Sequence, residues 1–347
     1  MKKVTVKDVA QASGYSISTV SKVFNGTDRV GEAAVRKIRQ VAKQLGYRSS
    51  MSAQSVAGKR RKIAVVLFES PKQVRSLFEH GFHTAFDLYG EFGIEPTYYF
   101  YNTSSALPWE DLAQHFDGVI ITPSDALKSD MRSLEQLGKN VPLILLQTKP
   151  SGLATIPHLA AVTVDAYTVG AMSAQFLSFC CPRHARVGIL VGYQDAWIHA
   201  QNTAGFLHSA KKYGLYVEQA GECFDDKESA YMRTEELLKR CPDLSGLFVT
   251  SYVSDSVCCC LSDHQASGVK VVGVDLLADT VACLHSGLQS AAIFQNQAEQ
   301  AQTAVHLLVD HLRGAEVPAD VLVKPELVLS ANLSCYGWPE NVPAKEE

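Results

Sequence analysis

Residues 4–26, VTVKDVAQASGYSISTVSKVFNG, predict two short helices joined by a tight turn. Thr5 followed three residues later by Asp8 forms a capping box, so a helix is expected to begin there. Gly14 suits the left-handed backbone that ends such a helix. Ser16 then supplies the oxygen of a second N-cap, and a second helix follows it. Two helices with this connection form a helix-turn-helix.

The second of these helices, residues 17–25, has two different faces. Val20 and Val23 give it an apolar stripe, while its other face is small, polar and basic. Such a face fits the major groove of DNA, where Lys22 can donate to guanine acceptors. A third helix, residues 32–45, repeats apolar residues at helical spacing and closes a three-helix core. This segment is therefore predicted to bind DNA.

The charges of the chain are divided in the same way. Residues 1–62 carry 14 basic and 3 acidic side chains, a net charge of +11, whereas the other 285 residues carry 18 basic and 33 acidic side chains, a net charge of −15. A basic head before an acidic body indicates a nucleic-acid-binding module joined to a part that does not bind nucleic acid. The alternative interpretation is that the basic side chains of residues 1–62 form a solvated surface that binds no nucleic acid.

The remaining chain is long enough for further domains, since 347 residues exceed the usual length of a single domain. Short apolar runs alternate there with amphipathic stretches, which predicts parallel sheets covered by helices on both faces. A first cycle of runs lies at 63–68, 97–100, 118–122 and 143–146, and a second cycle lies at 187–191, 247–249, 271–274 and 292–294. Two similar α/β lobes are expected.

The head and body together resemble the lactose/galactose-repressor (LacI/GalR) family of bacterial transcription regulators. The motifs that carry the resemblance are residues 4–10, 14–16, 18–26 and 45–47, with a looser likeness of the body to ribose-type periplasmic binding proteins. This implies an all-α helix-turn-helix head plus an α/β periplasmic-binding-protein-like body of two doubly wound parallel-sheet lobes. The implied domains are a DNA-binding head at 1–48, a hinge helix or linker at 49–62, and an effector-binding and dimerisation body at 63–340. The N-lobe would span about 63–164 and 296–324, and the C-lobe about 165–295 and 325–340.

The resemblance also assigns DNA contacts by position. It implies base reading by Ile17, Ser18 and Lys22, and phosphate contacts by Thr5, Ser16, Thr19, Ser21 and Asn25. The hinge would place Ala53 and Val56 in the minor groove, where an apolar wedge unstacks a base step. The family has leucine at the position of Val56, so a shallower kink or a contribution from Met51 is expected. A flexible tether is the alternative reading of this segment.

Ligands of open α/β sheets bind outside the carboxyl ends of the strands, where this chain places polar residues. Asp275 follows the family's Gly-x-Asp pattern, and its carboxylate is expected to accept from ligand hydroxyls. Asn202 stands where the family often has arginine, which argues against bidentate recognition of a carboxylate or phosphate. Trp197 and His199 have plain packing as their alternative role. The predicted ligand set is Asp275, Gln147, Trp197, His199, Asn202, Ser251 and Gln295, for a small sugar or related polyol.

The sequence thus predicts a cytoplasmic, homodimeric, sequence-specific DNA-binding repressor controlled by a sugar-like effector. No cofactor, metal site or enzyme activity is expected, because the chain lacks the common phosphate-loop, nucleophile-elbow and zinc-protease motifs. Neither a signal peptide nor an 18-residue apolar run occurs, so no membrane contact is expected. The consecutive Cys258, Cys259 and Cys260 point about 100° apart on a helix and are expected to be small buried hydrophobes. A cytoplasmic sugar-binding module or a sugar-converting enzyme without specific DNA binding is the alternative function.

Overall fold

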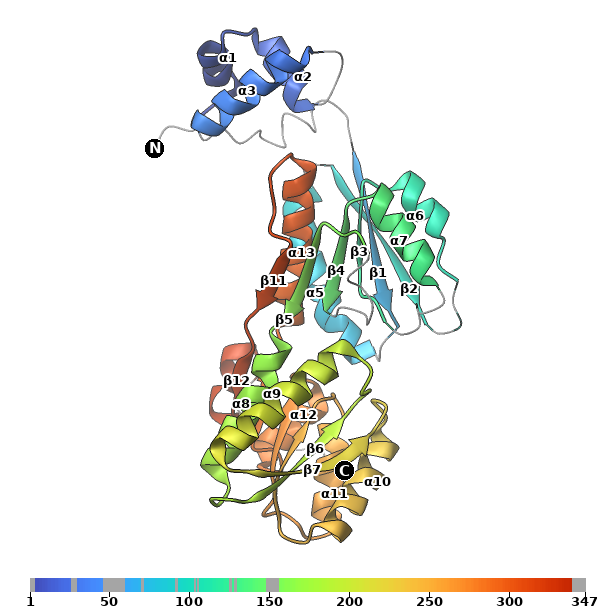
Figure 1. Cartoon of the computed structure of the whole chain (residues 1–347), viewed down its shortest axis with the longest axis vertical. Coiled ribbons are helices and arrows are strands. Elements are labelled where there is room, and N and C mark those ends of the chain that lie inside the picture. Colours follow the sequence, from blue (N-terminus) through green and yellow to red (C-terminus); the bar gives the residue numbers. More distant parts are fainter. Residues whose placement is uncertain are drawn as a thin grey trace.

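A computed structural model shows a small helical head followed by a body of two α/β lobes (Figure 1). It describes residues 4–25, 30–45, 60–69, 72–90, 93–102, 104, 106–124, 127, 130–147 and 156–338, without the side chains of Phe24, Asn25, Glu32, Lys43, Lys72 and Gln73. No helix within these ranges is long and apolar enough to cross a bilayer.

The head consists of three helices, α1 (Val6–Ser13), α2 (Ile17–Asn25) and α3 (Glu32–Leu45), as the sequence predicts. The Asp8 carboxylate reaches back and accepts from the backbone N–H of Thr5 at 2.7 Å. Gly14 ends α1 in the left-handed conformation, with φ of 75°. The three helices share one small apolar core that contains Val9, Ala10, Val20, Val23, Ile38 and Ala42.

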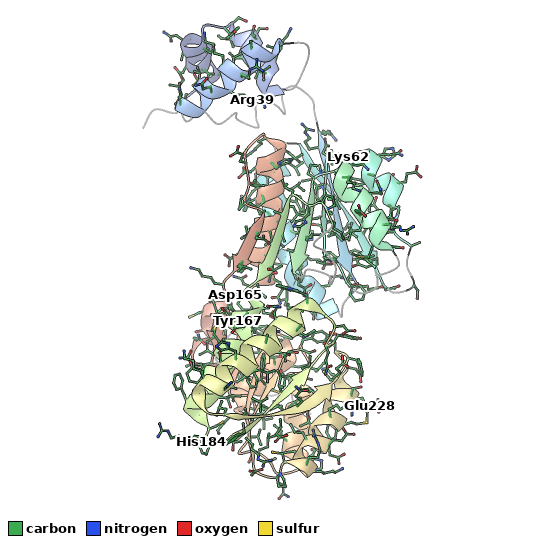
Figure 2. All side chains as sticks on the ribbon, viewed as in Figure 1. Arg39, Lys62, Asp165, Tyr167, His184 and Glu228 are labelled. Atoms are coloured by element: carbon green, nitrogen blue, oxygen red, sulfur yellow. The ribbon has the colours of Figure 1, made fainter. Side chains whose placement is uncertain are left out.

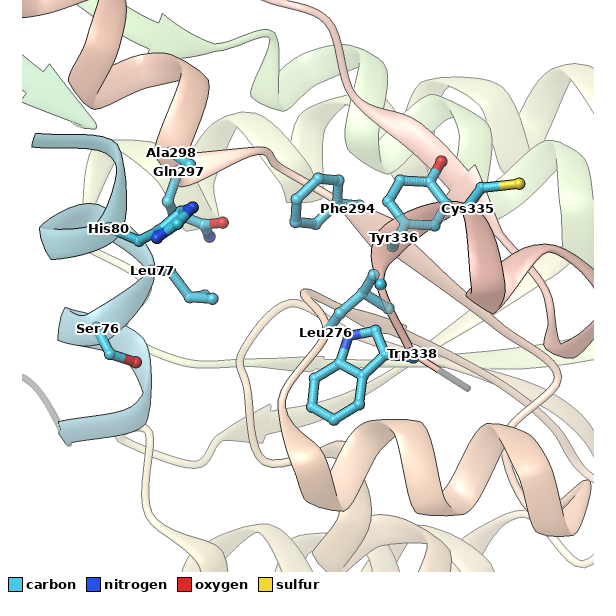
Figure 3. A pocket seen from close by; sticks show the side chains of 11 residues that line it. Ser76, Leu77, His80, Leu276, Phe294, Gln297, Ala298, Cys335, Tyr336 and Trp338 are labelled. Atoms are coloured by element: carbon cyan, nitrogen blue, oxygen red, sulfur yellow. The ribbon is translucent and has the colours of Figure 1, made fainter. Parts of the chain in front are cut away.

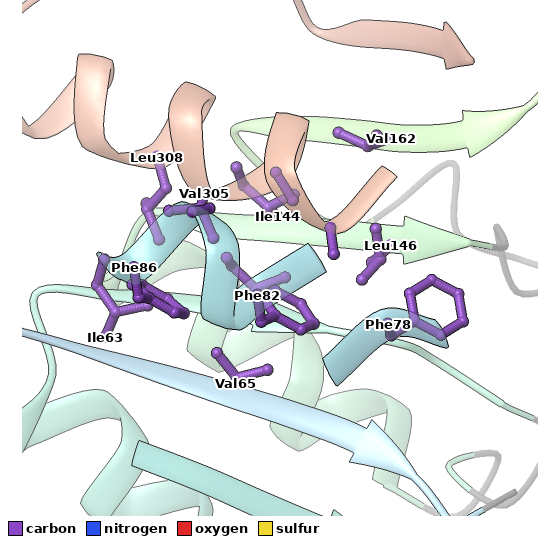
Figure 4. Close-up of a cluster of buried hydrophobic side chains, with 14 of the residues drawn as sticks. Ile63, Val65, Phe78, Phe82, Phe86, Ile144, Leu146, Val162, Val305 and Leu308 are labelled. Carbon is purple, nitrogen blue, oxygen red and sulfur yellow. The ribbon is translucent and has the colours of Figure 1, made fainter. Parts of the chain in front are cut away.

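The first lobe is built on an entirely parallel six-stranded sheet in the order β11-β5-β4-β3-β1-β2. Its strands are β1 (Arg61–Phe68), β2 (Ile94–Tyr101), β3 (Gly118–Ile121), β4 (Leu143–Gln147), β5 (Ala160–Val164) and β11 (Asp320–Val323). Helices α5 (Lys72–Gly90) and α13 (Gln297–Leu312) pack on one face, and α6 (Trp109–His115) and α7 (Met131–Asn140) cover the other. Figure 4 shows the hydrophobic core between the sheet and helices α5 and α13, where Phe82 and Phe86 of α5 meet Val65 of β1.

The second lobe repeats this arrangement in the order β12-β10-β9-β8-β6-β7. Its strands are β6 (Arg186–Val191), β7 (Tyr216–Glu222), β8 (Leu244–Val249), β9 (Lys270–Val274), β10 (Ala291–Phe294) and β12 (Glu326–Val328). Its helices are α8 (Ala166–Cys180), α9 (Trp197–Tyr213), α10 (Lys227–Arg240), α11 (Ser254–Asp263) and α12 (Ala278–Ser286), followed by the 3₁₀ helix η3 (Ser330–Tyr336). The outer strand β12 runs antiparallel to β10, so this sheet is not wholly parallel.

The described chain passes between the lobes after β5, after β10 and after β11. The residues after two of these strands are helix caps. The Asp165 side chain, labelled in Figure 2, accepts from the N–H of Thr168 at 3.0 Å and starts α8. The Asn296 side chain accepts from the N–H of Glu299 at 3.2 Å and starts α13. Two of the three crossings therefore end in a capped helix start, and the third leads into β12.

The cysteine run lies on α11, as the expected helical spacing requires. Cys258 and Cys260 are buried, which agrees with a packing role. Cys259 is exposed, so the expectation of burial is wrong for this residue. A rotation of about 100° per residue places the middle cysteine on the solvent side of the helix.

Candidate functional site

The candidate DNA-binding surface is the outer face of α2. Val20 and Val23 point into the head core, and Ile17, Ser18 and Lys22 lie exposed on the opposite side. Ile17 is 47% exposed, although it is a large apolar residue at the start of a helix. An exposed apolar side chain beside a hydroxyl and an ammonium group matches the major groove, which offers thymine methyl groups beside hydrogen-bond acceptors.

The residues expected to contact phosphate surround the start of α2. The hydroxyl oxygen of Ser16 accepts from the N–H of Thr19 at 3.1 Å, and the two hydroxyl oxygens lie 2.8 Å apart. Ser16 therefore caps α2, as its position predicts. Thr5 is exposed and Ser21 is partly buried. Helix starts favour anions because their N–H groups and dipole carry partial positive charge, so this end of α2 suits a phosphate.

Three of the predicted DNA contacts cannot be placed in this way. The side chain of Asn25 lies outside the described residues, and so do Ala53 and Val56 of the linker. Their roles stay predictions from the sequence.

The candidate effector site lies at the carboxyl ends of the strands, and its best-defined part joins β9 to β10. The side-chain amide of Gln295 donates to Asp275 Oδ2 at 3.0 Å, and the Gln295 backbone N–H lies 3.3 Å from Asp275 Oδ1. Both residues are buried, and Asp275 has φ of 62°, an uncommon left-handed conformation for a residue other than glycine. Strained backbone of this kind clusters at binding sites.

The buried carboxyl group of Asp275 has an altered acidity. Burial raises its pKa to about 6, while hydrogen bonds from the side chain of Gln297 and from Gln295 oppose the shift. The removal of water from the charged form is the larger of the two effects. Asp275 is therefore mostly ionised at neutral pH and can accept further hydrogen bonds.

A second polar group of the same lobe joins the end of β8 to α9. Nδ1 of His199 lies 2.8 Å from the hydroxyl of Thr250, which also accepts from the N–H of Gly192 at 3.2 Å. Nε2 of His199 lies 3.8 Å from Asp225 Oδ1, beyond hydrogen-bond distance. Burial lowers the pKa of His199, although the Asp225 carboxylate opposes the shift. The imidazole is therefore neutral at physiological pH.

The other predicted ligand residues are in different settings. Asn202 is 1% exposed and both polar atoms of its amide are buried without a partner among the described residues. The hydroxyl of Ser251 is also buried without a described partner. Trp197 packs against the core of the second lobe, which agrees with its alternative packing role. Gln147 belongs to the first lobe, where it ends β4 with φ of 72°.

The structure also adds residues that the sequence reasoning did not select. Gln297 hydrogen-bonds Asp275, and the Gln300 side chain donates to the carbonyl of Gln295 at 2.8 Å. Both lie on the first turn of α13, immediately after β10. The sequence signals them only by the closely spaced glutamines at 295, 297 and 300. The last two are three positions apart, so they lie on the same face at the start of α13.

Comparisons with known proteins agree with this organisation. Residues 5–50 match the family model described as bacterial regulatory proteins, lacI family, and residues 110–316 match the model described as periplasmic binding protein domain. The HTH-type transcriptional regulator CelR of Thermobifida fusca is 24% identical over 332 residues, which cover 90% of this chain and 93% of CelR. The maltose regulon regulatory protein MalI of Escherichia coli is 24% identical over 259 residues, or 71% of each protein.

A solved structure extends the comparison to the fold of the body. The ABC transporter solute binding protein of Burkholderia graminis, in complex with D-arabinose, superposes with a TM-score of 0.71 at 20% identity. It covers 80% of this chain and 98% of its own. At this identity the similarity concerns the fold alone.

Proposed function

Because the chain belongs to the lacI family of bacterial regulatory proteins, with a periplasmic binding protein domain as its body, we propose that it is a cytoplasmic homodimeric repressor. Its affinity for operator DNA is controlled by a small neutral sugar or polyol. In this proposal residues 1–48 bind DNA, 49–62 form the hinge, and 63–340 bind effector and dimerise.

The exposed outer face of α2 is the observation that carries the DNA-binding part of the proposal. Ile17, Ser18 and Lys22 lie on this face, while the opposite face of α2 packs in the head core. A recognition helix reads few base pairs, so two heads are needed for a specific site. This is the reason for proposing a homodimer on a near-palindromic operator, in which one two-fold axis relates both heads and both half-sites.

The proposed effector is neutral because of the polar groups that the predicted ligand residues offer. Carboxylate and amide groups are suited to the hydroxyl groups of a sugar, as are the buried hydroxyl of Ser251 and the amide of Asn202. No arginine stands at position 202 to pair with an anion. The solute binding protein from Burkholderia graminis, which shares the fold of the body, has D-arabinose bound. Together these points favour a polyhydroxylated ligand.

Control of DNA binding requires that the effector favours one arrangement of the lobes. The predicted ligand residues come from both lobes, Gln147 from the first and Asp275 with Gln295 from the second. A ligand held by both sides binds most tightly at one lobe angle, so it shifts the population toward that angle. The linker between β1 and α3 would pass this change to the heads.

The test is a selection of bound sequences from random duplex DNA by the full-length protein, followed by affinity measurements. Binding to the selected operator is measured across a salt series, with and without a panel of pentoses, hexoses, polyols and their phosphates. We expect a steep salt dependence from phosphate contacts and a change in affinity with one neutral sugar or polyol. The variant Asp275→Ala should keep operator affinity and lose the response.

Two outcomes contradict the proposal in different ways. If the selection enriches no sequence, the protein is not a specific DNA-binding regulator, and sugar binding alone would identify a ligand-binding module. If only a phosphorylated sugar changes operator affinity, the regulator part stands and the neutral effector is wrong.

A further inference from the structure

A pocket of about 590 Å³ lies where the two lobes meet, beside the passage from β10 to α13 (Figure 3). We call it the hinge pocket. Leu77 and His80 of α5 line it from the first lobe, and Phe294 and Trp338 line it from the second. Its volume falls within the range of about 300–1,000 Å³ that is typical of small-molecule sites. A ligand in it would touch both lobes.

The hinge pocket has aromatic walls and no charged residue. Phe294 and Tyr336 meet edge to face with ring centroids 5.2 Å apart, and Trp338 follows in the chain. The hydroxyl of Tyr336 donates to Glu326 Oε2 at 2.6 Å, which holds this ring in place. Among the described residues that line the pocket, none is Lys, Arg, Asp or Glu. An ionised ligand would lose its hydration there without gaining a partner of opposite charge.

One buried polar atom in this pocket points to a ligand. Gln297 is 2% exposed and lines the pocket, and Figure 3 shows its side chain beside His80. Its amide donates to the Asp275 carboxylate. Because an ionised carboxylate only accepts, the NH₂ end of the amide faces Asp275 and Oε1 is left as the acceptor. This oxygen has no hydrogen-bond partner in the described part of the chain, which is costly for a buried group.

We propose that the hinge pocket binds a neutral aromatic molecule that carries a hydroxyl or amine, and that Gln297 Oε1 accepts the hydrogen bond from this donor. The ring packs against Phe294, Tyr336 and Trp338. This pocket adjoins the sugar site of the proposed function, because Gln297 lines the pocket and also hydrogen-bonds Asp275. A ligand that touches both lobes also prefers one lobe angle, so the hinge pocket is a second input to the same conformational equilibrium.

Equilibrium dialysis of the full-length protein with three related probes tests this proposal. The probes are 2-naphthol, 2-methoxynaphthalene and 2-naphthoate at pH 7. We expect 2-naphthol to bind saturably at one molecule per chain. The methoxy compound should bind at least fivefold more weakly because it cannot donate to Gln297, and the naphthoate should not bind measurably because it is charged.

Variants of the lining residues test whether 2-naphthol binds in the hinge pocket. Ser76→Trp fills the α5 wall and should abolish 2-naphthol binding, while Ser262→Trp on the exposed side of α11 is the matched control and should leave it unchanged. Gln297→Leu removes the acceptor, so 2-naphthol and 2-methoxynaphthalene should then bind equally. Circular dichroism checks that each variant is folded, and His80→Trp replaces Ser76→Trp if the latter does not fold.

Several results would overturn the proposal. They are no saturable binding of 2-naphthol, binding that Ser76→Trp and His80→Trp leave intact, or equal binding of all three probes. The dialysis contains neither DNA nor sugar, so failure here leaves the proposed regulator function standing. Failure of operator binding would likewise leave the hinge pocket standing.

Discussion

The side chain of Gln295 donates to the carboxylate of Asp275 at 3.0 Å and thereby joins the ends of two neighbouring strands. The contact holds a buried carboxylate at the edge of the sheet, where the effector is proposed to bind. It does not fully offset the loss of water, because burial still raises the pKa of Asp275 to about 6.

The raised pKa of Asp275 predicts a pH-dependent effect of Asp275→Asn. Between the unfolded value near 3.8 and the folded value near 6, the folded protein binds more protons, so the Asp275 contribution to stability falls as the pH rises through this window. The variant lacks this loss. Its free energy of unfolding relative to the wild type should therefore rise by about 1 kcal/mol between pH 5 and pH 7.5. Urea denaturation at both pH values measures it, and a difference that does not change with pH would contradict the raised pKa.

Lys22→Ala should weaken specific operator binding by about 1–3 kcal/mol, because it removes the exposed ammonium group that is expected to donate to an acceptor on a base edge. Competition binding against scrambled DNA measures the effect. Lys211→Ala, in the last turn of α9, is the control for general loss of positive charge and should leave operator affinity unchanged. Equal affinity of Lys22→Ala and wild type would remove Lys22 from the recognition surface.

Gly205→Ala should destabilise the second lobe by about 2 kcal/mol, since a Cβ at this position would clash with the backbone carbonyl oxygen of Tyr167 on α8. Helices α8 and α9 can approach closely only because Gly170 and Gly205 lack side chains at their contact. Gly90→Ala is the control, because a Cβ there would meet no atom within 4 Å. Thermal unfolding compares the variants, and equal midpoints would disprove the close helix contact.

Val56→Leu should tighten operator binding and increase the bend of the DNA, because a larger apolar side chain unstacks a base step more fully. The prediction rests on the sequence, since residue 56 lies outside the described residues. Fluorescence energy transfer between dyes at the ends of the operator measures the bend. If Val56→Leu and Val56→Ala bend DNA to the same extent as wild type, residue 56 does not intercalate.

The sequence predicted the head in detail because its signals are local. The cap formed by Thr5 and Asp8, the left-handed turn at Gly14 and the apolar spacing of Val20 and Val23 each act within a few residues. The bounds of α2 and α3 therefore agree with the expected ones. The exposed face of α2 followed directly, since the face opposite a packed stripe must lie outward.

The strands of the body were predicted unevenly for a related reason. Buried strands such as β3 and β9 read as continuous apolar runs, because both faces of the sheet are covered by helices. Strands β7, β11 and β12 lie at sheet edges and are half exposed, so their sequences carry no such run and were not predicted. The inner strand β5 (Ala160–Val164) is buried and was also not predicted.

By itself, the sequence determined the family, the helical head and the two-lobed class of the body. Only the tertiary structure decided which polar residues meet. Asp275 reaches Gln295 because β9 and β10 are neighbours, and His199 reaches Thr250 because α9 and β8 pack together. The hinge pocket is lined by both Leu77 and Trp338, which are more than half the chain apart in the sequence. Helices and caps depend on bonds between residues a few positions apart, whereas these contacts depend on the strand order and lobe packing that burial of the whole core selects.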